Sequence, residues 1–309
     1  MTRTRKNIPP LANQPLANQP KVSRESCVPP PEPSPDLSGI FDNFNPVAFA
    51  QALLGFNPDP PQTRILLDTA ECGILNCTRQ FGKSTVCSVK ALHHMETHPD
   101  SLVLVITPSD RQSREFVRKT ARFVRKLGHP VRGDGDNPVS LQLPNGSRMV
   151  GLPCNESTIR GFSEVSLLLV DEAAQVPDEL YLTVRPMVAV SKGTIWLMST
   201  PKGRRGFFYN TWISDDPDWT RIAVPATECP RIPAKFLKQE ERIHGARSFR
   251  QEYLCEFVGD NQAIFDEDLV RSLIRSDVPS YSQRFQRPGY QPPQNPWQVY
   301  DWREIKWPI

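Results

Sequence analysis

The feature of this sequence that most restricts its fold is a regular alternation of short apolar runs with amphipathic segments between residues 40 and 257. The apolar runs predict strands at residues 72–78, 101–107, 166–172, 193–201 and 220–226. The intervening periodicity predicts helices at residues 83–97, 109–127, 177–188, 204–214, 234–244 and 248–257. Buried strands that alternate with helices predict an α/β fold, in which helices cover both faces of a mostly parallel sheet.

Two local signals add detail to this scheme. Asn145-Gly146 separates the apolar segments 139–144 and 147–153, and this dipeptide is a strong signal for a β-hairpin. Ser109 precedes the segment 110–127 and predicts the N-cap of that helix.

Composition changes at both ends of the chain. Residues 1–38 are rich in Pro, Asn, Gln and Ser and predict a disordered arm, and residues 261–309 predict a helix followed by an irregular tail. We therefore expect one domain at residues 39–260. The apolar runs are far shorter than the roughly 20 residues of a membrane span, and seven cysteines without a CxxC pair fit a reducing compartment. We expect a soluble, cytoplasmic protein that does not bind a membrane.

The stretch "NCTRQFGKST", Asn76 to Thr85, ends like a phosphate-binding loop. It follows a predicted strand and opens a predicted helix. Gly82, Lys83 and Ser84 supply backbone amides, an amine for the terminal phosphates and a hydroxyl for Mg²⁺. Cys77 replaces the first glycine of the usual pattern, so an ordinary turn between a strand and a helix is the alternative.

A second segment, "LLLVDEAA", places Asp171 and Glu172 at the end of an apolar strand. Adjacent side chains of an extended chain point in different directions. One carboxylate can therefore bind Mg²⁺ while the next polarises a water molecule. Alone, the pair could simply open a helix, but together with the upstream loop it predicts nucleotide hydrolysis.

Two further positions are candidates because of where they stand. Ser199 and Thr200 end the next strand, and the carboxyl ends of parallel strands share one edge, so both should lie beside the phosphates. Gln62 precedes the first strand, and its amide can both donate to and accept from an adenine edge. The alternative for Ser199 and Thr200 is a simple Ser-Thr-Pro turn, and the alternative for Gln62 is an ordinary surface glutamine.

Four segments together resemble the large subunit of tailed-phage terminases, the ATP-driven motors that package viral DNA. They are "NCTRQFGKST", "LPCNESTIRGFSEVSLLLVDEAAQVPDELY", "STPKGRRGFFY" and "FRQEYLCEF", and the resemblance covers about residues 55 to 265. A loop of the form RQxGKST without its first glycine is typical of this family. The resemblance implies a P-loop NTPase of the RecA-like ASCE type that uses ATP and Mg²⁺ and is encoded by a bacteriophage or prophage. It also implies double-stranded DNA, a terminase small subunit and a portal as partners of a homo-oligomeric ring.

The resemblance also implies roles for single residues. Arg79 would contact the γ-phosphate, Lys83 would contact the phosphates, and Glu172 would be the catalytic base. Ser84 and Asp171 would hold the metal. The other positions that it implies are Gln80, Gly82 and Thr85 around the phosphates, Gln62 at the adenine, Ser199 and Thr200 in the coupling motif, and Arg160 as a candidate finger toward a neighbouring subunit.

The sequence departs from the family in one respect. Complete terminase large subunits carry an RNase H-like nuclease domain after the ATPase, whereas about fifty residues follow Phe257 here. We therefore expect no nuclease activity, and the chain would be a stand-alone motor, one half of a split gene with a separate nuclease chain, or a remnant. A helicase-like ATPase and a degenerate terminase that binds without turnover are the alternatives. The basic clusters at 109–128 and 201–206 predict either a solvated face or a DNA contact.

Overall fold

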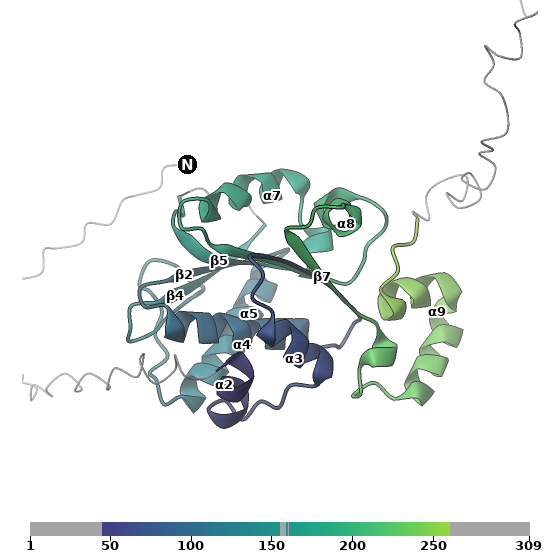
Figure 1. Ribbon diagram of the computed structural model, residues 1–309, viewed down its shortest axis with the longest axis horizontal. Coiled ribbons are helices and arrows are strands. Elements are labelled where there is room, and N and C mark those ends of the chain that lie inside the picture. The colour runs from purple at the N-terminus through teal and green to yellow at the C-terminus, as the bar shows by residue number, and fades with distance from the viewer. Residues whose placement is uncertain (1–44, 155–158, 160, 260–309) are drawn as a thin grey trace, which may run out of the picture. The chain divides into compact units, whose positions relative to one another are not determined.

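The computed structural model describes residues 45–154, 159 and 161–259 (Figure 1). The predicted arm at residues 1–38, the predicted tail at 261–309 and Arg160 lie outside the described residues. Among the helices of the described part, none is both long enough and apolar enough to cross a bilayer.

The described residues form a seven-stranded sheet with the strand order β3-β4-β2-β5-β6-β1-β7. All neighbouring strands pair in parallel except β3 and β4, which form the antiparallel hairpin predicted at Asn145-Gly146. The strands are β1 (Cys72–Cys77), β2 (Leu102–Thr107), β3 (Ser140–Gln142), β4 (Arg148–Pro153), β5 (Val165–Asp171), β6 (Thr194–Ser199) and β7 (Trp219–Val224). The prediction of a mostly parallel sheet is confirmed.

The order of the strands decides how the site is built. β6 lies between β1, which precedes the phosphate loop, and β5, which carries the acid pair. Asn76 in β1 and Asp171 in β5 therefore flank the same strand, opposite Ser199 and Met198. One additional strand between these two elements is the arrangement of the RecA-like ASCE class, and the predicted fold class is confirmed.

Helices cover both faces of the sheet, with α2 to α5 on one face and α7 and α8 on the other (Figure 1). The helices are α2 (Pro46–Ala52), α3 (Pro60–Leu67), α4 (Lys83–Thr97), α5 (Asp110–Lys126), α7 (Asp178–Val184), α8 (Gly206–Ile213) and α9 (Ala234–Leu254), with 3-10 turns η1 (Ala173–Gln175), η2 (Arg185–Val188) and η3 (Ala226–Glu228). Ser109 caps α5 as predicted, because its hydroxyl accepts from the Gln112 amide. The sequence analysis did not predict α2 and α3.

Three of the predicted helices differ from the structure in detail. The helix predicted at 177–188 is α-helical only to Val184 and continues as the 3-10 turn η2. Pro186 explains the change, because it has no backbone N–H to continue the α-helical ladder. The two helices predicted at 234–244 and 248–257 are joined in α9 across a kink at Gly245, where φ is 74°, and α9 ends three residues early, at Leu254.

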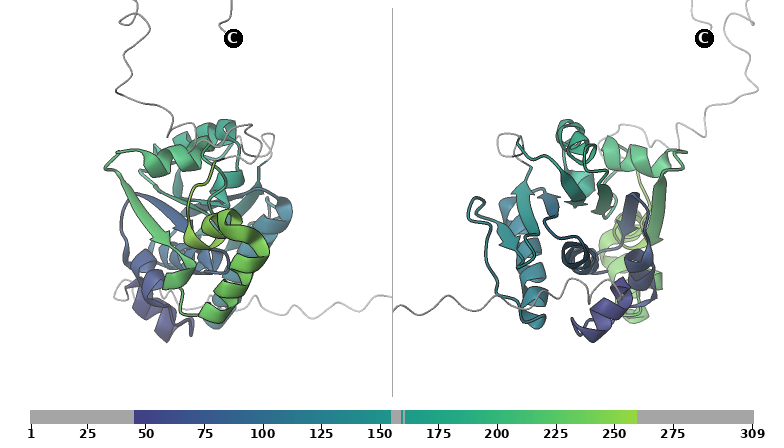
Figure 2. Two further views of the ribbon diagram at one scale, coloured as in Figure 1. Left: turned by 90° about the vertical axis from the view of Figure 1, so that its right-hand side faces the viewer. Right: turned by 60° about the vertical axis from the view of Figure 1, so that its left-hand side comes forward.

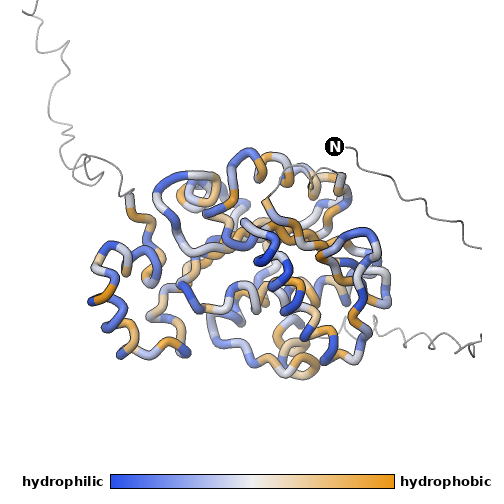
Figure 3. Tube along the Cα trace, turned by 180° about the vertical axis from the view of Figure 1, so that it is seen from behind, coloured by the Kyte–Doolittle hydropathy of each residue, from blue (hydrophilic) through white to orange (hydrophobic). Residues whose placement is uncertain are grey.

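The core lies on both faces of the sheet, as the hydropathy along the chain shows (Figure 3). All six residues of β2 are buried, with Val103 in the core under α2 to α5 and Leu104 in the core under α7 and α8. Because these parallel strands are buried on both sides, they appear in the sequence as continuous apolar runs.

One close contact fixes the position of α3 and α4 over the sheet. Trp196 in β6 pairs with Gly73 in β1, and a Cβ atom at Gly73 would lie 2.5 Å from the indole. The Lys90 amine lies 4.4 Å from the centroid of the same ring. Lys90 also donates to the carbonyls of Ile65 (3.3 Å) and Asp68 (2.6 Å) at the end of α3. A glycine at position 73 is therefore required for this packing.

Candidate nucleotide-binding site

The phosphate loop connects β1 to the first residue of α4. Gly82, the N-cap of α4, has φ 86° in the left-handed region that glycine adopts without strain. The loop is held from outside, because the Thr78 amide donates to Val224 in β7 (2.9 Å) and the Thr78 hydroxyl donates to the Glu252 carbonyl in α9 (3.1 Å). Because Gly82 has no side chain, no side-chain cap from a described residue occupies the first backbone amides of α4, and these amides can bind an anion.

The structure brings the loop and the acid pair together. The Lys83 amine lies 2.8 Å from Oε1 of Glu172, and these side chains are only 11% and 23% exposed. The Ser84 hydroxyl donates to Oδ2 of Asp171 at 2.8 Å. Two successive residues at the start of α4 thus contact two successive residues at the end of β5.

The protonation of this cluster follows from burial and charge. Burial lowers the pKa of Lys83, but the carboxylates of Glu172 and Asp171 outweigh it and raise the pKa above its ordinary value. Burial raises the pKa of Asp171, although Lys83 and the Ser84 hydroxyl oppose the change. Lys83 is therefore a firmly charged amine, and Asp171 is a carboxylate that gains from a cation beside it.

The backbone at Glu172 directs its side chain. Glu172 has φ 54°, a left-handed conformation that is uncommon for a residue with a side chain. Its amide donates to Oδ1 of Asp171 at 3.0 Å. The turn at this residue ends β5 and lets both carboxylates contact the start of α4, where Asp171 binds Ser84 and Glu172 binds Lys83.

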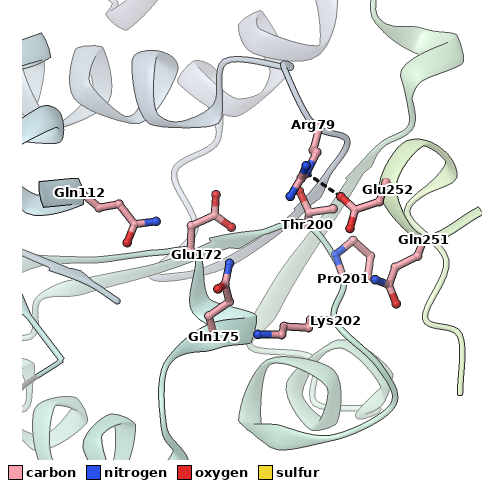
Figure 4. A pocket seen from close by; sticks show the side chains of 9 residues that line it. All are labelled: Arg79, Gln112, Glu172, Gln175, Thr200, Pro201, Lys202, Gln251 and Glu252. Atoms are coloured by element: carbon pink, nitrogen blue, oxygen red, sulfur yellow. Dashed lines mark ion pairs between the residues drawn. The ribbon is translucent and has the colours of Figure 1, made fainter. Parts of the chain in front are cut away.

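A cavity of about 410 Å³ opens beside this cluster. Gln112 and Glu172 enter it from one side, and Arg79 and Glu252 from the other (Figure 4). The residues that line it come from five segments and are Arg79, Gln112, Glu172, Gln175, Thr200, Pro201, Lys202, Gln251 and Glu252. The sequence analysis missed Gln112, Gln175 and Gln251, and it noted Lys202 only within a basic cluster.

The predicted coupling residues do not both face this cavity. Thr200 lines it, but Ser199 is fully buried and its hydroxyl donates to the Thr200 carbonyl at 2.8 Å. Thr200 is therefore the predicted coupling residue at the cavity, whereas the Ser199 hydroxyl is buried and held by a local acceptor, so the role of both beside the phosphates stays a prediction.

Arg79 lies at the cavity but is paired with α9. Its guanidinium Nε is 2.7 Å from Oε2 of Glu252, and its side chain is 68% exposed. Its backbone amide also donates to the Glu252 carbonyl at 3.2 Å. The family resemblance implies that Arg79 contacts the γ-phosphate, but nothing in the sequence indicates its contact with Glu252, which is remote along the chain.

Gln62 supports the phosphate loop from the other side. It is 2% exposed, which rules out the surface alternative. Its Oε1 accepts from the Asp59 amide (3.1 Å) in a capping box for α3, and its Nε2 donates to the Phe81 carbonyl (3.3 Å). Arg231, which the sequence analysis missed, also donates to the Phe81 carbonyl and lies 3.0 Å from Asp59.

The side chains of Ser84 and Asp171 fit a magnesium ion. They offer a hydroxyl and a carboxylate, which are hard oxygen ligands, and they are already within hydrogen-bond distance of each other. Magnesium in nucleotide sites commonly uses one or two such protein ligands and fills its remaining positions with phosphate and water oxygens.

The family model described as "Terminase large subunit, T4likevirus-type, N-terminal" matches residues 74–272. The chain belongs to the terminase large subunit family. The terminase large subunit of Thermus phage G20c is 26% identical over 258 residues, which covers 69% of this chain and 51% of that protein. The chain thus spans about half the length of the curated relatives it matches.

Solved structures show the same fold. The large terminase ATPase domain of Thermus phage P74-26 has a TM-score of 0.61 at 22% identity, over 70% of this chain and 100% of that one. The large terminase of a thermophilic bacteriophage, solved in complex with ATP-γ-S, has a TM-score of 0.54 at 14% identity, over 69% of this chain and 51% of that one. This terminase chain therefore has the fold of large terminase ATPase domains.

Proposed function

We propose that this chain is a terminase motor that hydrolyses ATP with Mg²⁺ and thereby moves double-stranded viral DNA. The observation that carries the proposal is the double contact of Lys83 with Glu172 and of Ser84 with Asp171, both at 2.8 Å. Four residues from two separate elements supply an amine, a hydroxyl and two carboxylates at one rim of the sheet. The thermophilic-phage terminase that was solved with ATP-γ-S has the same fold. Residues 39–260 would form the ATPase domain.

In the proposed reaction the charged amine of Lys83 leaves Glu172 and binds oxygens of the terminal phosphate. Ser84 and Asp171 would hold Mg²⁺, and the chemistry that the ion would supply when bound is neutralisation of phosphate charge. The carboxylate of Glu172, released from Lys83, orients the attacking water and accepts its proton. Positioning and charge stabilisation, more than covalent chemistry, would supply the rate.

The remaining site residues have supporting roles in this proposal. Arg79 would exchange Glu252 for the γ-phosphate, because a guanidinium fork suits a phosphoryl group. Gln62 would border the adenine. Backbone amides of the loop would bind the phosphates, with contributions from Gln80, Gly82 and Thr85. Ser199 and Thr200 would couple hydrolysis to movement, with only Thr200 at the cavity.

The partners are also part of the proposal. We propose that the chain works in a homo-oligomeric ring in the host cytoplasm, with a small subunit and a portal. Arg160 would reach a neighbouring subunit.

The test is ATP turnover by the purified chain with Mg²⁺, in the presence and absence of linear duplex DNA. We expect Lys83→Ala and Glu172→Gln each to lower turnover by roughly 10² or more. Glu172→Gln should still bind ATP, because Lys83 then has no carboxylate competing for it. Lys235→Ala, an exposed amine on α9, is the matched control. Turnover by Lys83→Ala at the parent rate would refute the assignment.

A further inference from the structure

Five arginines form a straight row along α5. They are Arg111, Arg114, Arg118, Arg122 and Arg125, and all five are exposed. Their spacings of three and four residues place them within about 80° of the helix circumference and spread them over about 21 Å of its length. The row is therefore one continuous edge of guanidinium groups.

The net positive charge of this helix exceeds that of the whole chain. Seven of its seventeen residues are basic and two are acidic, so α5 carries a net charge of +5, whereas the whole chain carries +3. Arg114 and Arg118 have partners within the helix, Asp110 and Glu115. The arginine side chains of these pairs are 60% and 63% exposed, so water screens the pairs and an external anion can replace the acid.

The other three arginines, Arg111, Arg122 and Arg125, make no side-chain ion pair or hydrogen bond with residues in the described ranges. Packing of the opposite side of α5 keeps the five arginines on the exposed side of the helix. Phe116 and Val124, on the opposite side of α5, are buried, and α5 packs against α4, β2 and β4. Figure 2 shows α5 at the flank of the helical layer, next to the β3–β4 hairpin.

We propose that this arginine row is the surface that contacts the phosphate backbone of duplex DNA. The proposal rests on the proposed function, which requires a DNA contact but assigns no surface to it. A straight row of like charges suits a linear polyanion, since about 21 Å spans roughly six phosphates of one DNA strand. Guanidinium groups bind phosphates in bidentate fashion, and such contacts carry no sequence preference.

The aromatic residues of α5 favour a duplex over a single strand. Single-strand binding relies on exposed rings on which bases stack. Phe116 is buried, and Phe123 packs edge-on against Phe56 with centroids 6.1 Å apart. The exposed arc of α5 therefore offers charge without a stacking platform.

The same helix reaches the nucleotide site. Gln112, in the first turn of α5, lines the cavity beside Glu172. The Ser109 hydroxyl donates to its Oε1 at 2.8 Å, which fixes the amide group. DNA held on the arginine row would therefore be anchored to an element that forms one wall of the catalytic cavity, and its binding would be sensed there.

The experiment uses the full chain with Arg118→Gln, Arg122→Gln and Arg125→Gln combined, at the end of α5 remote from Gln112. The matched control removes three exposed charges from α9 by Lys235→Gln, Lys238→Gln and Arg242→Gln. Fluorescence anisotropy with a labelled duplex of about 30 base pairs, long enough to extend past the roughly six phosphates of the row, measures affinity over a range of salt concentrations. ATP turnover is measured with and without DNA.

We expect the α5 variant to lower the slope of log affinity against log salt by about 2 to 3, because each lost phosphate contact contributes about 0.9. Its affinity should fall at least roughly tenfold near 0.1 M salt, and DNA should no longer stimulate turnover. Basal turnover and the melting temperature should match the parent, and the control should keep the parent slope.

An unchanged slope in a folded α5 variant would overturn the proposal, whether or not the protein hydrolyses ATP. A reduced slope in a chain that has no ATPase activity would support the arginine row and count against the proposed function. Parent-like DNA binding with loss of self-association in the ultracentrifuge would assign the row to an acidic protein surface, and would also overturn the proposal.

Discussion

The contact between Lys83 and Glu172 makes a quantitative prediction about stability. At 2.8 Å and an effective dielectric constant of about 20, the attraction between the two charges is about 6 kcal/mol. Desolvation of both groups offsets most of it, because they are only 11% and 23% exposed. We expect a net coupling of about 2 kcal/mol between the two side chains in buffer without nucleotide or Mg²⁺.

The assay is a double-mutant cycle with Lys83→Met, Glu172→Gln and the combined variant. Methionine keeps the apolar stem of the lysine, and glutamine keeps the shape of the carboxylate. Urea denaturation gives each free energy of unfolding, and constant m-values would show that the comparison is valid. Lys83→Met alone should cost about 3 kcal/mol, since it leaves Glu172 and the buried Asp171 without their amine.

In a domain of this size, each kcal/mol corresponds to about 2–4 °C in melting temperature. The melting temperature of the double variant should therefore lie closer to that of Glu172→Gln alone than the sum of the two single-variant effects predicts. A coupling below about 0.5 kcal/mol would refute the reasoning, because the two side chains would then behave as independent surface groups.

Three further predictions follow from buried groups. Burial raises the pKa of Asp171, so its ionisation costs stability as the pH rises from the ordinary carboxyl pKa through the raised one. Asp171→Asn should therefore raise the free energy of unfolding at pH 7, measured in urea, and should abolish ATP turnover. Gly73→Ala would place a methyl group 2.5 Å from Trp196 and should cost about 1–3 kcal/mol by thermal melting, with partial recovery in combination with Trp196→Phe. Burial and the nearby charges of His98, His93 and Lys90 lower the pKa of His94 to about 4. Between about pH 6.5 and pH 4, this histidine therefore binds a proton in the unfolded chain but not in the folded one. Stability should fall by about 3 kcal/mol as the pH falls through that window, and His94→Gln should lose this dependence in urea titrations at each pH.

Much of the fold could be predicted because its signals are local. The central strands are apolar on both faces, α5 has a strong amphipathic period, Ser109 marks the start of that helix, and Asn145-Gly146 marks the hairpin turn. The phosphate loop and the acid pair could be matched because both end strands of one parallel sheet. The 3-10 turn at Pro186 was missed, although the loss of a backbone donor at this proline was visible in the sequence.

The rest of the site depends on contacts that no local pattern encodes. Glu252 reaches Arg79 only because the end of α9 folds back along the phosphate loop. Gln112 faces Glu172 because β2 lies next to β5 in the sheet, and this order cannot be read from the sequence. The Ser199 hydroxyl donates to the carbonyl of the next residue, a local contact that the strand pattern does not encode.

The central claim is that Ser84 and Asp171 hold one metal ion against a triphosphate bound by Lys83. It is tested most directly by a crystal structure with Mn²⁺ and a non-hydrolysable ATP analogue, in which anomalous scattering locates the metal. We predict an anomalous peak about 2.1 Å from the Ser84 hydroxyl, with Asp171 bound directly or through one water, and the Lys83 amine on the phosphates. A peak elsewhere, with the Ser84–Asp171 hydrogen bond and the Lys83–Glu172 ion pair both intact, would contradict the account.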